Sequence, residues 1–380
     1  MIKKVFIISG EESGDLHGGT LITALKKLVP SLEVGGMGGE KMRKAGLKGP
    51  DSKEVSVVGV VEVIEKLPKI LKTFRELKKT LADGGFDCVV LIDFPDFNLR
   101  FAKEAKKLGV PVIYYISPQV WAWRKGRVKE IARLVDKMLV VFPFETGIYK
   151  EAGVDVEYVG HPLADITECG LTREGARKAL GIESRGTVIS LLPGSRTGEV
   201  KRLLGAMLKA GEIMEKGLGA KDKPLFILPA ANSIDDSLIN EFTKKTAVEV
   251  MVVRGAMYSA LRASDAAVVA SGTATLETAL IGTPMAIIYK MSPVSYGIAK
   301  ALVGVKNVGL PNIVAGRRVV PELIQGQATP EGIAAEILGI LNDGKKRAAI
   351  IKGYKEIKRS LGVKGAADKA AKAIYRVINK

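Results

Sequence analysis

The chain has 380 residues, of which 47% are hydrophobic and 26% are charged. This composition is typical of a folded globular protein and excludes general disorder, while the length allows two domains that each bury a core. The net charge of +17 at pH 7 indicates acidic partners such as nucleic acid, anionic lipid or phosphorylated substrates.

Short apolar runs rich in β-branched residues alternate with longer amphipathic stretches. The first run, residues 5–9, is too short for the apolar region of a signal peptide and predicts a first strand. No run reaches the ~18 apolar residues of a spanning helix, so we expect a cytoplasmic protein whose membrane contact is peripheral. The runs that predict strands are residues 5–9, 88–92, 112–116, 137–142, 156–159, 188–192, 225–228, 248–253, 266–270 and 285–288.

Continuous apolar strands separated by helices predict parallel sheets covered on both faces. The pattern pauses near residues 164–172 and then starts again. We therefore expect an α/β chain with two doubly wound, Rossmann-like lobes facing a cleft, followed by helices. The expected domains are residues 1–167, 168–343 and a helical tail, 344–380. Ligands of such sheets bind beyond the carboxyl ends of the strands.

Two acidic segments of the first lobe follow predicted strands. Asp93 comes directly after the strand at 88–92, so it should face the cleft and is the candidate catalytic base; a structural role is the alternative. Asp96 precedes a helical pattern and is expected to be its N-cap. The loop 10–15 (GEESGD) follows the first strand and lacks a Gly-x-Gly-x-x-Gly motif, so we expect no dinucleotide cofactor.

Two further segments of the first lobe suit an amphipathic ligand. One contains both tryptophans beside cations, a combination that fits a phosphorylated, partly apolar ligand or ordinary core packing. The other is an apolar run ahead of a helix with a basic face, which suits a lipid surface or is an ordinary core-facing helix. Their candidate residues are Trp121, Trp123 and Arg124 in the first, and Val57, Val58 and Val60 in the second.

In the second lobe, two strands end in small-residue turns that open helices. Glycine lets a backbone approach a ligand closely, arginine grips phosphate, and a helix N-terminus offers free N–H groups to an anion. Each turn alone could be structural, but the pair favours a diphosphate site. The two turns contain Gly194, Ser195 and Arg196 after the strand at 188–192, and Ser271, Gly272 and Thr273, with Glu277 in the following helix, after the strand at 266–270.

Metal ligands are scarce in the sequence. It has no Asp-x-Asp triplet, its histidines are His17 and His161, and its cysteines are Cys88 and Cys169. Close carboxylate pairs usually hold a divalent metal ion. The pattern predicts a metal-free site in which Arg196 and a helix N-terminus stabilise a leaving diphosphate. Two cysteines argue against a disulfide framework or a zinc site.

Positive charge is concentrated near the end of the chain. Residues 341–380 contain twelve Lys and Arg against three Asp and Glu. An anionic membrane would attract such a surface, although solvated helix faces explain it equally well. Nucleic-acid binding is disfavoured, because aromatic residues make up 6% of the chain and no known binding module is recognisable.

The motifs taken together resemble the lipid A disaccharide synthase family over essentially the whole chain and in the same order. The Trp-Ala-Trp-Arg and Asp-x-Pro-Asp-Phe-Asn segments are its specific elements, whereas the Ser-Gly-Thr loop is shared by many sugar transferases. The segments that carry the resemblance are 10–15, 93–98, 117–127, 143–145, 160–162, 192–196, 271–277 and 310–312.

The resemblance implies a GT-B type, inverting glycosyltransferase without a cofactor. UDP-2,3-diacylglucosamine would donate its sugar to the 6-hydroxyl of 2,3-diacylglucosamine 1-phosphate (lipid X), giving a β-1,6 disaccharide and UDP. It also implies peripheral association with the inner leaflet of the inner membrane and is compatible with a homo-oligomer. The alternative is another UDP-sugar enzyme of the same fold, such as a different transferase or a UDP-N-acetylglucosamine epimerase.

Site roles follow from the same resemblance. Asp93 matches the proposed base, and Glu11 matches an essential acid in the first loop. Arg196, Glu277 and Asn312 match residues placed around UDP. The chain departs from the family at Glu12, where alanine is usual, so an extra charge stands beside Glu11.

Overall fold

The computed structural model describes residues 3–54, 60–120, 126–166, 170, 172–182, 186–219, 223–291, 307–362 and 364–379. The chain divides into two compact units: unit 1 contains residues 1–165 and 361–380, and unit 2 contains residues 166–360. The expected tail at 344–380 is therefore not a separate domain. Helix α16 (Gly344–Ser360) belongs to unit 2, whereas α17 (Ala366–Ile378) belongs to unit 1, where its apolar face packs against α1 (Glu12–Leu28).

Unit 1 is built on a parallel seven-stranded sheet in the order β3-β2-β1-β4-β5-β6-β7. Its strands are β1 (Lys4–Ser9), β2 (Glu33–Met37), β3 (Leu47–Lys48), β4 (Cys88–Ile92), β5 (Val112–Tyr115), β6 (Lys137–Val140) and β7 (Val156–Tyr158). Five of them match predicted runs. The sequence did not predict β2 and β3, because β2 is glycine-rich and β3 has two residues. In β2, a side chain at Gly36 would overlap the backbone of the neighbouring β1.

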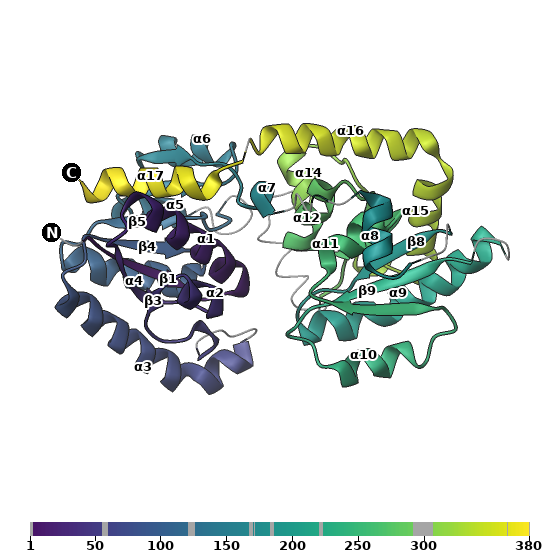
Figure 1. Cartoon of the computed structure of the whole chain (residues 1–380), viewed down its shortest axis with the longest axis horizontal. Helices are drawn as coiled ribbons and strands as arrows, with labels where there is room; N and C mark the ends of the chain where they lie inside the picture. The colour runs from purple at the N-terminus through teal and green to yellow at the C-terminus, as the bar shows by residue number, and fades with distance from the viewer. Residues whose placement is uncertain are drawn as a thin grey trace. The chain divides into compact units, whose positions relative to one another are not determined.

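The helices of unit 1 cover both faces of this sheet (Figure 1). Right-handed crossovers lead in opposite directions from β1 and from β4. Accordingly α1 packs against α17, whereas α3, α4 and α5 pack in succession. The remaining helices are α2 (Glu40–Lys44), α3 (Val60–Gly84), α4 (Pro95–Lys107), α5 (Arg127–Leu134), α6 (Glu145–Glu151) and α7 (Leu163–Ile166), which ends at the boundary of the units.

An aromatic cluster joins α3 and α4 to the sheet. Phe101 of α4 stacks on Phe6 of β1, with ring centroids 5.6 Å apart, and Phe74 of α3 meets Phe101 edge to face. The apolar residues of α3 are buried only in part. Leu77 and Leu81 are buried, but Leu71 is 44% exposed, as is Leu67 one turn earlier.

Unit 2 contains a parallel six-stranded sheet in the order β10-β9-β8-β11-β12-β13. Its strands are β8 (Val188–Leu192), β9 (Leu225–Ala230), β10 (Val250–Arg254), β11 (Ala266–Ala270), β12 (Met285–Tyr289) and the short, unpredicted β13 (Glu322–Ile324). Its helices, with α16, are α8 (Arg173–Ala179), α9 (Thr197–Leu218), α10 (Asp236–Thr243), α11 (Met257–Ala263), α12 (Thr273–Ile281), α14 (Leu310–Ala315) and α15 (Pro330–Asn342). The two doubly wound α/β lobes expected from the sequence are confirmed.

Each sheet has one point where the strand order reverses. In unit 1 this point lies between β1 and β4, and in unit 2 it lies between β8 and β11. The loops that leave two such strands diverge to opposite faces and leave a crevice at the carboxyl edge, which is where open α/β sheets bind ligands. The fold therefore selects two pairs of loops as candidate sites.

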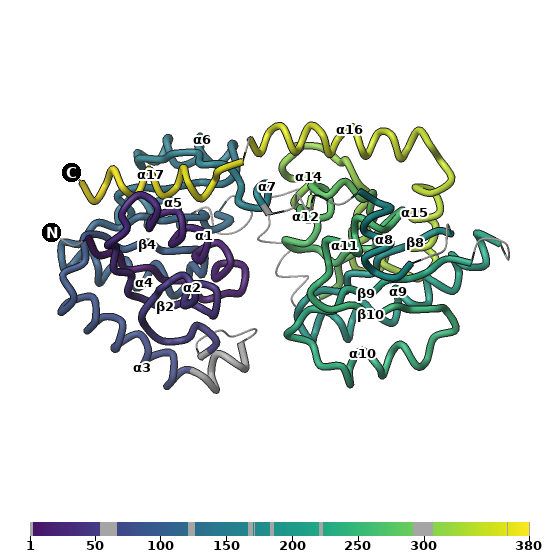
Figure 2. The backbone as a smooth tube through the Cα atoms, viewed as in Figure 1, coloured from purple at the N-terminus to yellow at the C-terminus, as the bar shows by residue number. Residues whose placement is uncertain are grey.

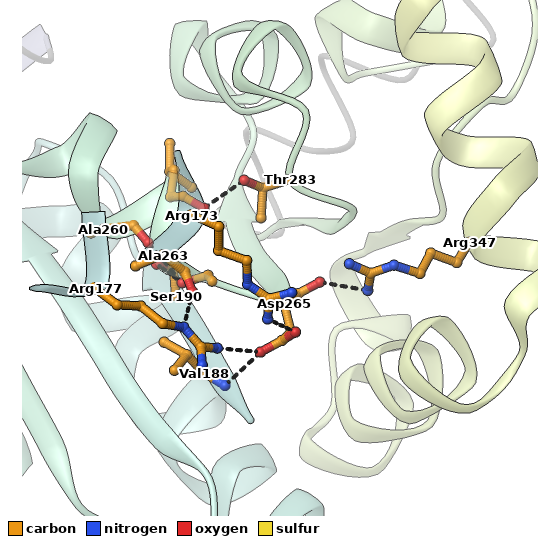
Figure 3. A network of polar contacts seen from close by, with 11 residues as sticks. Arg173, Arg177, Val188, Ser190, Ala260, Ala263, Asp265, Thr283 and Arg347 are labelled. Atoms are coloured by element: carbon orange, nitrogen blue, oxygen red, sulfur yellow. Dashed lines mark hydrogen bonds and ion pairs between the residues drawn. The ribbon is translucent and has the colours of Figure 1, made fainter. Parts of the chain in front are cut away.

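A network of three arginines and one aspartate joins helices to the amino ends of two central strands of the unit 2 sheet (Figure 3). The carboxylate of Asp265, just before β11, accepts hydrogen bonds from Arg173 and Arg177 of α8 and from the Val188 backbone N–H. Arg347 of α16 donates to the Asp265 carbonyl oxygen at 2.8 Å. One carboxylate thus ties the first helix of the unit and the start of α16 to the amino ends of two central strands.

The ends of the described chain meet in unit 1 (Figure 2). Lys3 donates from its ammonium group to the carbonyl oxygen of Ile378 at the end of α17. Where the chain re-enters unit 1, the Asp165 carboxylate accepts from the backbone N–H groups of Gly365 and Ala366, at 2.7 and 3.1 Å. The exit and return points of the chain are therefore joined by hydrogen bonds.

No helix among the described residues combines the length and apolarity needed to cross a membrane. Cys88 is fully buried in β4, and burial raises the pKa of its thiol.

Candidate functional site

The unit 1 site lies at the switch point between β1 and β4. The loop after β1 carries Gly10 and Glu11, and the loop after β4 carries Asp93 and Phe94. A side chain at Gly10 would overlap the Phe94 ring, so glycine allows the two loops to touch. Asp93 and Phe94 both have left-handed backbones, with φ of 45° and 49°, a region that non-glycine residues seldom occupy.

The structure brings together the two acids predicted to be catalytic. Asp93 is half-buried, and burial, followed by the negative charge of Glu11, raises its pKa to about 7; the Phe94 backbone N–H lowers it. Glu11 is exposed and precedes the first turn of α1. A carboxylate with a pKa near neutrality is suited to accept a proton at physiological pH.

Two neighbouring acids differ from Asp93 in their surroundings. Asp96 is not the N-cap of α4: the cap is Phe94, and Asp96 lies in the first turn, where it is exposed and paired with Arg127. The expected capping role is therefore wrong, because Pro95 starts the helix one residue before Asp96. Glu12 is an exposed first residue of α1.

The two histidines lie in unit 1 and are buried. Burial, followed by the charge of Lys41, lowers the pKa of His17 to about 4, and burial lowers that of His161 to about 3. Both are therefore neutral at physiological pH. In the part of the chain that the structure describes, no group of three or more His, Cys, Asp or Glu side chains is placed to hold a metal ion.

The unit 2 site lies at the switch point between β8 and β11. Because these strands are paired, the turns that follow them are neighbours. Arg196 is the N-cap of α9 and Gly272 is the N-cap of α12, and neither helix has a side-chain hydrogen bond at its cap. Two helix N-termini without side-chain caps thus follow the carboxyl ends of paired strands, an arrangement that favours an anion.

The turn after β8 presents its polar residues to solvent. Ser195 and Arg196 are exposed, and the Arg196 guanidinium lies 3.3 Å from the Glu199 carboxylate. Gly194 has φ of 110°, and a side chain there would overlap Glu199. The glycine requirement comes from the turn itself. Among the described residues, the Arg196 guanidinium pairs with Glu199 alone, at the surface, so the arginine can turn to a ligand.

The turn after β11 opens α12 with small residues. Gly272 and Thr273 are exposed, while the Ser271 hydroxyl donates to the Val308 carbonyl at 3.2 Å. Glu277 is half-buried one turn into the helix and accepts a hydrogen bond of 2.7 Å from Tyr258. Burial raises the pKa of Glu277, and the Tyr258 bond lowers it.

Asn312 differs from the other residues predicted around UDP. Its side chain is fully buried. Its Nδ2 donates to the Val320 carbonyl and to Glu322, and its Oδ1 accepts from the Val319 and Val320 backbone N–H groups. All four hydrogen bonds of the amide are made inside unit 2, so the structure gives Asn312 the geometry of a supporting residue.

Several predicted acceptor residues are not placed by the structure. Trp121, Trp123, Arg124, Val57 and Val58 lie outside the described residues. Val60 begins α3, and its side chain is not among those described.

Comparison with known proteins shows one family over the chain. The family model described as Lipid-A-disaccharide synthetase matches residues 5–375. Proteins named lipid-A-disaccharide synthase from Syntrophus aciditrophicus and Geobacter metallireducens are 48% and 45% identical to this chain, with 100% of the chain and 98% of each relative covered. A solved UDP-GlcNAc 2-epimerase from Neisseria meningitidis bound to UDP-GlcNAc shares the fold, with a TM-score of 0.58 and 12% identity over 99% of both chains.

Proposed function

Since the chain belongs to the lipid-A-disaccharide synthase family and is a glycosyltransferase of that family, we propose that it joins two diacylglucosamine units. The donor is UDP-2,3-diacylglucosamine and the acceptor is the 6-hydroxyl of 2,3-diacylglucosamine 1-phosphate. The observation that carries this proposal is the match to one family over residues 5–375. The epimerase shares the fold only, at 12% identity, so the alternative of an epimerase is not favoured.

The donor diphosphate is assigned to unit 2. Arg196 and the open N-termini of α9 and α12 supply positive charge at the strand reversal, where a nucleotide binds in sheets of this kind. As UDP leaves, these groups stabilise the charge that develops on its phosphates. We assign to Glu277, which accepts a hydrogen bond from Tyr258, the role of accepting hydrogen bonds from sugar hydroxyls, and to Asn312 the support of the neighbouring loop.

The acceptor is assigned to unit 1. Asp93 accepts the proton of the acceptor 6-hydroxyl while the oxygen attacks the anomeric carbon of the donor. The bond from that carbon to UDP breaks on the opposite face, so the configuration inverts. The charge of Glu11, which contributes to the raised pKa of Asp93, makes this carboxylate a stronger base.

The function is tested by incubating the protein with the two diacylated substrates and identifying products by mass spectrometry. A tetraacyl disaccharide phosphate and UDP, formed in equal amounts, are the expected products. Release of UDP without the disaccharide, or conversion of UDP-N-acetylglucosamine to an epimer, would refute the proposal and support the alternative.

Activity should not depend on a divalent metal. The sequence has no Asp-x-Asp triplet, and arginine with two helix N-termini is proposed to take the diphosphate. Turnover measured in excess EDTA should equal turnover without it. A large loss that magnesium or manganese restores would contradict this prediction.

The pH profile should show the titration of Asp93. Its pKa is raised to about 7, and a base must be ionised, so kcat/KM should fall about tenfold per pH unit below that value. Glu11→Gln removes a charge that raises this pKa and should move the acidic limb to lower pH. Glu12→Gln is the matched control, since Glu12 is not among the groups that shift Asp93. If the acidic limb of the kcat/KM profile stays in place in Glu11→Gln, or moves equally in both variants, the assignment of this limb to Asp93 is contradicted.

Peripheral membrane contact is proposed for the outer face of α3. There Leu67 and Leu71, each 44% exposed, lie among the exposed cations Lys72, Arg75 and Lys79. Apolar side chains enter the interface while cations attract anionic lipid.

Vesicle cosedimentation tests this contact. Binding to vesicles rich in anionic lipid should weaken as salt is added, and Leu67→Ser/Leu71→Ser should weaken it at every salt concentration. Val252→Ser removes a side chain of unit 2 that is also exposed, at 39%, and should have no effect. Equal binding to neutral vesicles at all salt concentrations would exclude the electrostatic part.

A further inference from the structure

The backbone carbonyl of Asp93 is held by two buried side chains from different elements. Asn98, in the first turn of α4, donates from Nδ2 to this oxygen at 2.7 Å and to the Ile92 carbonyl at 3.2 Å. Tyr114 of β5 donates its hydroxyl to the same Asp93 oxygen at 2.6 Å. Both side chains are fully buried.

This arrangement fixes a backbone that would otherwise relax. Asp93 and Phe94 are both left-handed, and such conformations persist only where the surroundings hold them. The left-handed pair turns the chain sharply between β4 and α4, so the direction of the Asp93 peptide sets the direction of its side chain. Two donors on one carbonyl oxygen determine that direction.

Asn98 and Tyr114 both act as hydrogen-bond donors to the Asp93 carbonyl oxygen. Burial raises the pKa of Tyr114 well above its usual value, so the hydroxyl keeps its proton and donates. The Oδ1 of Asn98 is buried without a hydrogen-bond partner among the described residues. An unpaired buried amide oxygen costs free energy. The two hydrogen bonds donated by Nδ2 offset this cost and account for an asparagine at position 98.

We propose that Asn98 and Tyr114 are positioning residues for the transfer reaction, which aim the Asp93 carboxylate by holding its backbone carbonyl. The inference rests on the proposed role of Asp93 as the base. A base must lie within hydrogen-bond reach of the proton that it accepts, and a small misplacement of a catalytic group can cost ~10²-fold in rate.

Tyr114→Phe is the test, because it deletes one hydroxyl and keeps the ring. We expect kcat to fall about tenfold or more, with KM for the donor and the melting temperature near those of the wild type. The matched control is Tyr115→Phe: Tyr115 is the next residue, is equally buried, and has a hydroxyl without a hydrogen-bond partner in the described part of the chain. It should retain wild-type kcat.

A double-mutant cycle separates positioning from a structural effect. If Tyr114 acts through Asp93, then Tyr114→Phe should cost nothing further in an Asp93→Asn background. Equal turnover of Tyr114→Phe and Tyr115→Phe would overturn the inference, and so would an undiminished Tyr114→Phe effect in that background.

If Asp93→Asn itself has wild-type turnover, the assignment of the base fails and the inference fails with it. If the wild type makes no disaccharide, the proposed function itself is refuted.

Asn98→Ala is a second variant for the same cycle. It removes the bonds to both carbonyls, so its effect on kcat should equal or exceed that of Tyr114→Phe. That effect should also vanish in the Asp93→Asn background. An Asn98→Ala enzyme that folds and has wild-type kcat would overturn the role of Asn98.

Discussion

Asp93→Asn is expected to lower the turnover number by ~10²–10⁴, the usual cost of losing a general base. A primary hydroxyl holds its proton tightly at neutral pH, so attack on the donor requires an acceptor for that proton. Asn keeps the shape of the side chain but cannot take the proton. The fold and the affinity for UDP should be retained, because UDP is assigned to unit 2. Turnover, thermal melting and UDP affinity are the measurements.

Asp96→Asn is the control for this experiment. Asp96 is a carboxylate three residues away, exposed, and paired with Arg127 at the surface. Exposed ion pairs contribute ~0–1 kcal/mol, so this variant should be close to the wild type in both stability and turnover. If Asp96→Asn loses turnover while Asp93→Asn keeps it, the two roles are reversed.

Arg196→Ala should be the second largest loss, at ~2–4 kcal/mol of transition-state stabilisation or ~30–10³-fold in rate. The side chain is 53% exposed and forms a surface ion pair with Glu199, so its removal should change the melting temperature little. The lost charge acts on the phosphates most strongly as UDP departs, and the fall should therefore appear in kcat as well as in kcat/KM.

Lys209→Ala is a matched change of charge on the same helix. Lys209 is exposed further along α9, away from the turn after β8. Its loss should leave turnover unchanged, which separates a local contact to the diphosphate from the general effect of positive charge. Wild-type turnover in Arg196→Ala would remove this residue from the site.

The sequence predicted the parts of the fold that depend on apolar periodicity. All ten predicted strands are present, because buried parallel strands are continuous apolar runs. Strands β2, β3 and β13 were not predicted: Gly35 and Gly36 weaken the pattern of β2, and the other two are very short. These strands are stabilised by pairing with their neighbours, which is tertiary information.

Within the candidate sites, sequence position predicted which loops meet but not what individual side chains do. Asp93 and Glu11 meet because their strands flank a reversal of strand order. The structure shows that both ends of the Asn312 amide form hydrogen bonds with other residues of unit 2. Asn98 and Tyr114 were not singled out, because their contact to Asp93 depends on the left-handed turn after β4.

The order of the units along the chain has a consequence for biosynthesis. Unit 2 is inserted between residues 165 and 361 of unit 1, so a ribosome completes all of unit 2 before it makes α17. Until then the apolar surface of α1 that α17 covers stays open, and the first unit to begin synthesis is the last to be finished. Domains usually fold in the order of translation. In this chain, residues 166–360 of unit 2 are made before the final helix of unit 1, so unit 1 cannot complete its core until after unit 2 has been synthesised.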